Sequence, residues 1–125
     1  MIQGIGIDLV ENDRIEKIIR KWGQKFLQRV FSEEEITYCG KHIQASIHYG
    51  ARFAAKEAFL KALGIGLGMG VKLREIEVVS DDQGKPDLSL RDGAQLHLEK
   101  REIKIIHLSL THTKKYATAI VILEK

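Results

Sequence analysis

Apolar residues alternate with small or polar residues over residues 2–10, and a period of two predicts a β-strand there. One face of this strand carries Ile5, Ile7 and Leu9. The opposite face carries glycines and a single carboxylate, Asp8, so another backbone or a ligand can approach it closely. Asp8 is therefore the one functional group that this face offers.

A helical pattern follows this strand. Asp13 is the expected N-cap, and Glu16 would reach back to complete a capping box. At about 100° per residue, one face is apolar and is formed by Ile15, Ile19, Trp22, Phe26 and Val30. Another face is mainly basic and is formed by Arg14, Lys17, Lys21, Lys25, Gln28 and Arg29. We expect one continuous helix that carries its charge away from the core.

Two further helices are predicted in the first half of the chain. Ser32 opens a second capping box and a short helix that continues to about Tyr38. The longer helix covers residues 46–63 and is apolar nearly all round, which is typical of a buried helix. Gly64 follows it as the expected left-handed cap.

Strand patterns occupy most of the second half, with one short helix among them. The strands are expected at residues 75–79, 86–90, 103–111 and 116–123, and the short helix at residues 94–101. The last two strands would form a hairpin. This order predicts an α+β fold in which a mostly antiparallel sheet packs against a long central helix, with additional N-terminal helices. We expect a single domain over residues 1–125.

The composition is that of a soluble globular protein, with 44% hydrophobic and 30% charged residues. No apolar run reaches the roughly 18 residues of a membrane span, and no signal peptide is visible. Cys39 is the single cysteine, which excludes an intrachain disulfide and favours a cytoplasmic location. Its expected place is a buried apolar contact. The net charge of +3 permits nucleic acid, an acidic protein or a phosphorylated metabolite as partner.

Two carboxylates stand in apolar segments, Asp8 at the end of the first strand and Glu57 within the long helix. Burying an unpaired carboxylate costs several kcal/mol, so two of them suggest one shared site. Mg²⁺ takes one or two carboxylates and completes its shell with water and phosphate oxygens. Lys61, four residues after Glu57, would face phosphate oxygens as a counter-charge. Ordinary helical ion pairing between Glu57 and Lys61 is the alternative.

Two loops carry further candidate ligands. Residues 64–70 form an alternating glycine loop that lacks the ending of a P-loop, so it is either a flexible connector or a lid that lines a ligand channel. Ser109, Thr111 and His112 collect groups that suit phosphate, although they equally describe a polar hairpin tip.

The basic helix has two functional interpretations beside that of a solvated face. Ile18 stands at the edge of the positive stripe and is a suitable anchor for an acidic amphipathic helix. A basic nucleic-acid-binding module is the alternative. It is disfavoured because aromatic residues make up only 6% of the chain and no base-stacking platform is visible.

Four short sequence motifs are spread over nearly the whole chain. They are residues 4–8, residues 52–59 with Lys61, residues 84–86, and residues 109–113. In this order and spacing they resemble the holo-[acyl-carrier-protein] synthase family of 4′-phosphopantetheinyl transferases. The resemblance implies Mg²⁺-dependent transfer of 4′-phosphopantetheine from coenzyme A to a serine of apo acyl carrier protein, which releases adenosine 3′,5′-bisphosphate. It also implies a homotrimer with active sites between subunits.

The resemblance gives each matched position a role. Asp8 and Glu57 would hold Mg²⁺, Lys61 would contact the phosphates, and these three would be the catalytic residues. Coenzyme A would be bound by Arg52, Lys61, Gly64, Lys85, Pro86, Ser109, Thr111 and His112. The acidic second helix of the carrier protein would meet Arg14, Ile18, Lys21 and Lys25. The incoming serine would lose its proton either to Glu57 or to a metal-bound water that Asp8 orients.

Two structural expectations accompany these roles. The bare face at Gly4 and Gly6 would let the metal and the diphosphate lie against the first strand. Apolar residues such as Ile105 and Ile120 would bury a subunit contact. A non-catalytic subunit that only binds the carrier protein is a third alternative.

Overall fold

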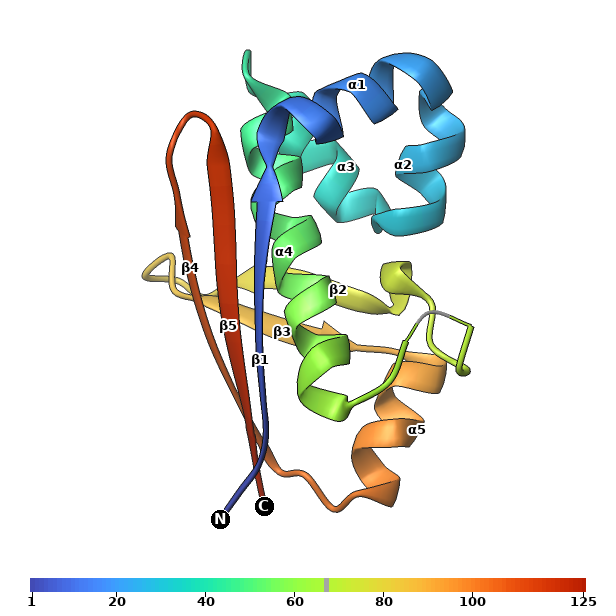
Figure 1. Ribbon diagram of the computed structural model, residues 1–125, viewed down its shortest axis with the longest axis vertical. Helices are drawn as coiled ribbons and strands as arrows, with labels where there is room; N and C mark the ends of the chain where they lie inside the picture. The colour runs from blue at the N-terminus through green and yellow to red at the C-terminus, as the bar shows by residue number, and fades with distance from the viewer. Residues whose placement is uncertain (67) are drawn as a thin grey trace.

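The computed structural model describes residues 1–66 and 68–125, and its elements follow the predicted order (Figure 1). The strands are β1 (Ile2–Glu11), β2 (Ile76–Ser80), β3 (Pro86–Leu90), β4 (Ile105–His112) and β5 (Tyr116–Glu124). The helices are α1 (Asn12–Trp22), α2 (Gln24–Val30), α3 (Glu33–Gly40), α4 (Ala45–Leu63) and α5 (Asp92–Lys100), with a 3₁₀ turn η1 (Leu73–Glu75). The α+β class with a long central helix is confirmed.

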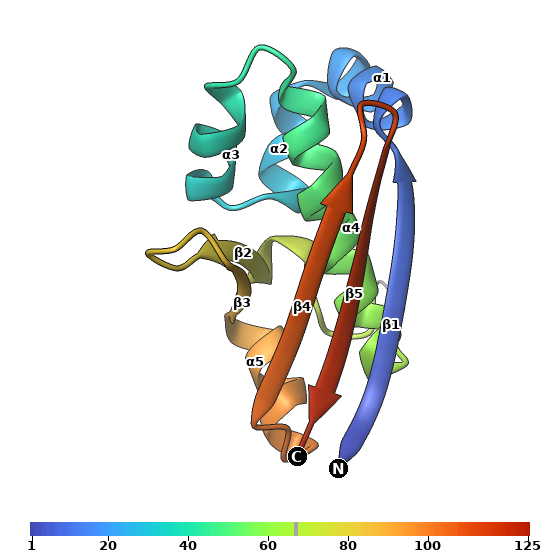
Figure 2. The ribbon, with the colours of Figure 1, turned by 90° about the vertical axis from the view of Figure 1, so that its left-hand side faces the viewer.

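The strands form two antiparallel sheets rather than one. A three-stranded sheet has the order β1-β5-β4, and β2 and β3 form a separate hairpin. Figure 2 shows the three long strands side by side with α4 behind them. Helix α4 thus lies against the inner face of the larger sheet, and its other side contacts β2 and α3.

Helix α4 packs directly on the glycine face of β1. A Cβ atom added at Gly6 would lie 1.9 Å from the carbonyl oxygen of Ala58, and one added at Gly4 would lie 2.0 Å from that of Ala62. Only glycine permits this approach. The bare face of the first strand is therefore filled by helix backbone, and the expectation that metal and diphosphate lie there is wrong.

The first helix departs from its prediction at both ends. Its N-cap is Glu11, which makes no side-chain cap bond, so the expected cap at Asp13 is wrong. Gly23 ends α1 with a φ of 56°, and α2 then starts in a new direction. Because the helix breaks there, Trp22 does not continue the apolar face and is 55% exposed.

The capping box at Ser32 is confirmed, and it belongs to a buried polar cluster. The Ser32 hydroxyl accepts from the Glu35 amide, and the Glu35 carboxylate accepts from the Ser32 amide. That carboxylate also pairs with Lys56 of α4 at 2.7 Å, and both side chains are almost fully buried. Helix α4 is thereby held to α3 by an ion pair as well as by packing.

The single cysteine lies in the core. Cys39 is fully buried, as expected, and burial raises the pKa of its thiol to about 12. None of the helices within the described residues has the length and apolar character needed to cross a membrane.

Candidate active site

The structure brings Asp8, Glu57 and Lys61 together on the inner side of β1. Asp8 follows Gly4 and Gly6 in the alternation of the strand, so its side chain points toward α4. The Lys61 ammonium donates to the Asp8 carboxylate at 2.9 Å and to the carbonyl of Ile7 at 3.1 Å. The Asp8 side chain is 14% exposed and that of Lys61 is 55% exposed, so the pair lies at the mouth of the contact between β1 and α4.

Glu57 lies one helical turn before Lys61 and is half-buried. Burial raises the pKa of the Glu57 carboxyl, the negative charge of Asp8 raises it further, and Lys61 opposes both effects. Two carboxylates that share so little water carry an excess of negative charge, and a divalent cation relieves such an excess. The donor set therefore fits a hard cation.

A metal at this position would draw only part of its shell from the protein. Within residues 1–66 and 68–125, no group of three or more His, Cys, Asp or Glu side chains is arranged to hold a metal ion. Two carboxylates leave several positions for water and for substrate oxygens, which is the usual arrangement for Mg²⁺.

Lys85 and Pro86 lie at the start of β3, beside the edge strand β4. A cavity of about 300 Å³ separates the β2–β3 turn from β4, and Ile106, His107 and Leu108 form its other wall. Asp81 holds the turn by accepting from the Lys85 amide at 2.8 Å. These residues are thus placed together along the free edge of the larger sheet.

Arg52 and His112 both lie near His48, in the N-terminal half of α4 and away from Lys61. The Arg52 guanidinium lies over the ring of Tyr38, 4.4 Å from its centroid. His48 stacks on His42 with ring centroids 3.8 Å apart, and His112 is 6.4 Å from His48. Burial lowers the pKa of His48, and the neighbouring side chains of His42, Arg52 and His112 lower it further. The stacked pair His42 and His48 had no recognisable spacing in the sequence.

Ser109 and Thr111 lie on the opposite face of the sheet from Asp8. In the register of β1, β5 and β4, Ser109 is in line with Ile7, and Thr111 is in line with Leu9. All four side chains point outward, whereas Asp8 points toward α4. Within one chain the structure does not bring these hydroxyls to the two carboxylates, because the sheet stands between them.

The residues expected to meet a partner are divided between two helices. Arg14 and Lys21 are exposed on α1, and Ile18 is half-buried there, whereas Lys25 belongs to α2 beyond the break at Gly23. The expected single basic helix is therefore two short helices at an angle (Figure 1).

An apolar groove beside α2 was not predicted. It has a volume of about 980 Å³, and its walls include Phe26, Phe53, Val71 and Leu73. Its lining also includes Arg29, Lys72 and Arg74. Phe26 was expected on the apolar face of the first helix, and Phe53 belongs to the apolar helix predicted over residues 46–63, but their meeting at one groove depends on how α2 turns after Gly23.

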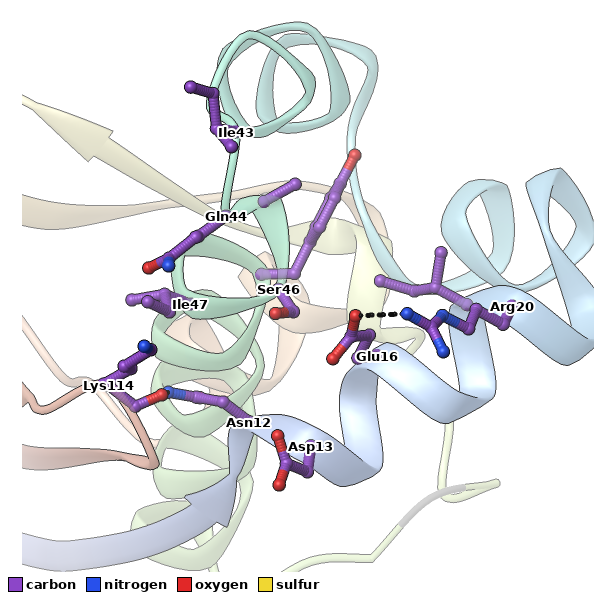
Figure 3. A pocket seen from close by; sticks show the side chains of 12 residues that line it. Asn12, Asp13, Glu16, Arg20, Ile43, Gln44, Ser46, Ile47 and Lys114 are labelled. Carbon is purple, nitrogen blue, oxygen red and sulfur yellow. Dashed lines mark hydrogen bonds and ion pairs between the residues drawn. The ribbon is translucent and has the colours of Figure 1, made fainter.

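A further cavity of about 410 Å³ lies between α1, the start of α4 and the β4–β5 turn (Figure 3). Asp13, Glu16, Arg20 and Lys114 line it, and Glu16 pairs with Arg20 at 2.9 Å. The cavity is lined by charges of both signs, and Glu16 and Arg20 neutralise each other. It therefore lacks the concentrated negative charge of the Asp8 site.

Gly64 adopts the left-handed conformation with a φ of 73°, as expected for the cap of α4. Its amide bonds back to the carbonyls of Leu60 and Lys61, so the glycine loop leaves the helix directly beside the site. Leu67, in the middle of that loop, lies outside the described residues.

Comparison with known proteins decides the family. A family model described as the 4′-phosphopantetheinyl transferase superfamily matches residues 4–121. The chain belongs to the 4′-phosphopantetheinyl transferase superfamily. The predicted family, the enzyme class and the phosphopantetheinyl transferase fold are therefore confirmed.

Relatives of this transferase match it over nearly their full length. A holo-[acyl-carrier-protein] synthase of Syntrophus aciditrophicus is 55% identical over 124 residues, which are 99% of this chain and 97% of that protein. The crystal structure of such a synthase from Neisseria meningitidis has a TM-score of 0.92 at 35% identity and covers 100% of both chains. A Bacillus anthracis synthase in complex with CoA (3′,5′-ADP) has a TM-score of 0.81 at 40% identity, over 98% of this chain and 96% of that chain.

The raised pKa of Glu57 predicts that this transferase carries a stability cost at its site. A carboxyl whose pKa is raised in the folded state stabilises the fold while protonated, and that contribution is lost as pH rises through the folded pKa. Glu57→Gln keeps the neutral form at all pH values. The variant should match the parent near pH 4 and exceed its free energy of unfolding by about 0.5–1 kcal/mol at pH 7.

Urea denaturation at a series of pH values measures this difference. Glu99→Gln is the matched control, because Glu99 is exposed and its bond from Gln95 is kept by an amide oxygen. A constant offset between Glu57→Gln and the parent from pH 4 to pH 7 would contradict the prediction.

Proposed function

We propose that this transferase moves the 4′-phosphopantetheine group of coenzyme A to a serine of apo acyl carrier protein and releases adenosine 3′,5′-bisphosphate. The observation that carries the proposal is the meeting of Asp8, Glu57 and Lys61, two carboxylates and one amine, in a chain of this superfamily. Phosphoryl transfer requires positioning and charge neutralisation more than covalent chemistry by the protein.

Asp8 and Glu57 are the residues that would hold Mg²⁺. When bound there, the ion would neutralise negative charge on the diphosphate of coenzyme A. Lys61 would add a positive charge on the same side of the leaving phosphate, because its ammonium is half-exposed and already bonded at Asp8. We assign the acceptance of the serine proton to Glu57, because its carboxylate lies at the site beside Asp8 and Lys61.

The nucleotide part of coenzyme A would contact two separate groups of residues. Lys85 and Pro86 border the cavity along β4, and near the end of that strand Arg52 supplies a positive charge and His112 an imidazole. Gly64 would leave room beside Lys61 for the pantetheine arm, because an added Cβ there meets no atom within 4 Å. The Bacillus anthracis synthase, which binds CoA (3′,5′-ADP), supports a nucleotide ligand of this kind.

The outer face of the larger sheet would be a subunit contact in a homotrimer. Ile5, Ile7 and Leu9 of β1 are each between 59% and 65% exposed, and they lie beside Ile105, Ile120 and Ile122 on β4 and β5. Figure 2 turns this face toward the viewer, and among the described residues no helix or strand covers it. A contiguous apolar face of this kind is typical of an interface between proteins. Ser109 and Thr111 on it would reach the site of a neighbouring subunit.

The carrier protein would dock against α1 and α2. Arg14, Lys21 and Lys25 would steer an acidic helix, and Ile18 would contact its apolar side. The apolar groove beside α2 would accept a further apolar side chain, since Arg29, Lys72 and Arg74 at the groove continue the positive charge.

The first test is transfer itself. With Mg²⁺ and coenzyme A, the protein should increase the mass of an apo acyl carrier protein by one phosphopantetheinyl group, as followed by mass spectrometry. Asp8→Ala and Glu57→Ala should each lower the rate by on the order of 10²-fold or more, because each removes a carboxylate aimed at developing charge. Glu33→Ala, on the exposed start of α3, is the control.

Three outcomes would contradict this assignment in different ways. An unchanged carrier mass with folded protein rejects the transferase activity. Binding of the carrier without a change in mass indicates a non-catalytic subunit. Full activity in both carboxylate variants rejects the metal role of Asp8 and Glu57.

The subunit contact is tested by placing a charge on the outer sheet face. Ile7→Lys should dissociate the trimer, because a lysine at the centre of the apolar face must be desolvated on assembly. Light scattering coupled to size-exclusion chromatography measures the mass, and transfer activity should fall with it. Ile43→Lys is the matched control, since Ile43 is fully exposed and lies away from the sheet. A parent protein that is monomeric and active would refute the contact.

Docking of the carrier is tested by charge reversal on α1. Arg14→Glu and Lys21→Glu should each raise the KM for the carrier about tenfold at low salt and less at high salt, because exposed charges are screened. The affinity for coenzyme A should stay unchanged. Lys100→Glu at the end of α5 provides the control. Equal losses for carrier and coenzyme A would show that the surface has been assigned wrongly.

A further inference from the structure

Lys56 is adjacent to Glu57 in the sequence but belongs to a different side of α4. Successive side chains on a helix diverge by about 100°, so Glu57 turns toward β1 while Lys56 turns toward α3 and β2. The Lys56 side chain is fully buried, and its ammonium donates to the Glu35 carboxylate at 2.7 Å, to the carbonyl of Leu73 at 3.1 Å and to the carbonyl of Ile76. Its three protons thus have three acceptors from three elements.

Glu35 is held as firmly as its partner. Its carboxylate also accepts from the Ser32 amide at 2.9 Å and from the Val78 amide at 3.0 Å, and the residue is only 2% exposed. The ammonium of Lys56 therefore bonds to fixed acceptors that cannot follow α4 if the helix rotates. This arrangement ties the rotation of α4 to α3, η1 and β2.

Among the described residues, the opposite side of α4 has no buried ion pair, and its polar contact is the half-exposed bonding of Lys61 to Asp8 and the Ile7 carbonyl. There the helix meets Gly4 and Gly6 through the backbone of Ala58 and Ala62. Glycine and alanine surfaces allow close approach, but they carry no long side chains that interdigitate and fix one rotation. The contact sets the distance between α4 and β1, and the buried bonds of Lys56 add a second constraint on the direction in which Glu57 and Lys61 point.

We infer that Lys56 is a positioning residue: by bonding to Glu35 and two backbone carbonyls, it fixes the rotation of α4 so that Glu57 and Lys61 face Asp8. Lys56 does not touch the site and acts only through the helix. The inference rests on the proposed function for its kinetic consequence, but its geometric consequence is independent of any activity.

The test must separate positioning from stability. Lys56→Met alone leaves the Glu35 charge buried and unpaired, which destabilises the fold strongly. The double variant Lys56→Met with Glu35→Gln removes both charges and so avoids a buried, unpaired charge. We expect it to fold with a lower melting temperature than the parent, because an amide at position 35 has one oxygen for the Ser32 and Val78 amides, to keep the KM for coenzyme A, and to lose on the order of 10- to 100-fold in kcat.

A crystal structure of the double variant supplies the readout that is independent of activity. The Lys61–Asp8 contact, 2.9 Å in the parent, should lengthen beyond hydrogen-bonding distance. Leu88→Ala in β3 is the control, because it destabilises a buried position that contributes no bond to Lys56. It should keep both the parent kcat and the Lys61–Asp8 contact.

The outcomes are distinct. A double variant with parental kcat and an intact Lys61–Asp8 contact overturns the inference, as does an equal loss of kcat in Leu88→Ala. If the parent shows no transfer, the proposed function fails and the crystallographic distance alone decides the role of Lys56. If the double variant does not fold, Lys56→Arg replaces it, because the positive charge stays beside Glu35 while the bonds to the two carbonyls change; kcat should then fall less than in the double variant, with unchanged KM.

Discussion

The contact between α4 and the glycine face of β1 is the constraint on which the rest of the structure depends. Gly6 lets the carbonyl of Ala58 approach the strand so closely that any side chain at that position would collide with it. This short separation brings the strand residue that follows the two glycines next to the edge of α4 that faces β1. Asp8 is that strand residue, and Lys61 is the helix residue that it meets.

Polar consequences follow from this packing. Burial at this contact leaves the Glu57 carboxyl short of water, and the nearby charge of Asp8 adds to the cost of ionising it, so the pKa of Glu57 rises. Lys61 compensates part of this cost while remaining half-exposed. A site with two carboxylates and one accessible amine carries a net negative charge, which a divalent cation would compensate, leaving positive charge for phosphate oxygens.

Periodicity and local chemistry explain which features could be predicted from the sequence. The alternation around Asp8, the capping box at Ser32 and the cap at Gly64 are local patterns, and each has the predicted structure. Glu57 stood out because a carboxylate in an apolar helix is costly. Lys56 could not be interpreted in the same way, since its partner Glu35 lies on another helix and only the tertiary fold brings the two together. The break at Gly23 was missed because the apolar period continues across it.

The two faces of the larger sheet explain why one chain does not assemble every residue of the predicted site. Asp8 lies on the inner face, and Ser109 and Thr111 lie on the outer face, so no rearrangement of side chains can bring them together through the strands. The outer face is also where exposed isoleucines are concentrated. If these hydroxyls contact substrate, they must do so across a boundary that the same isoleucines bury. Subunit assembly and substrate binding would then depend on the same sheet face. Its isoleucines would form the subunit contact, and its hydroxyls would contact the substrate.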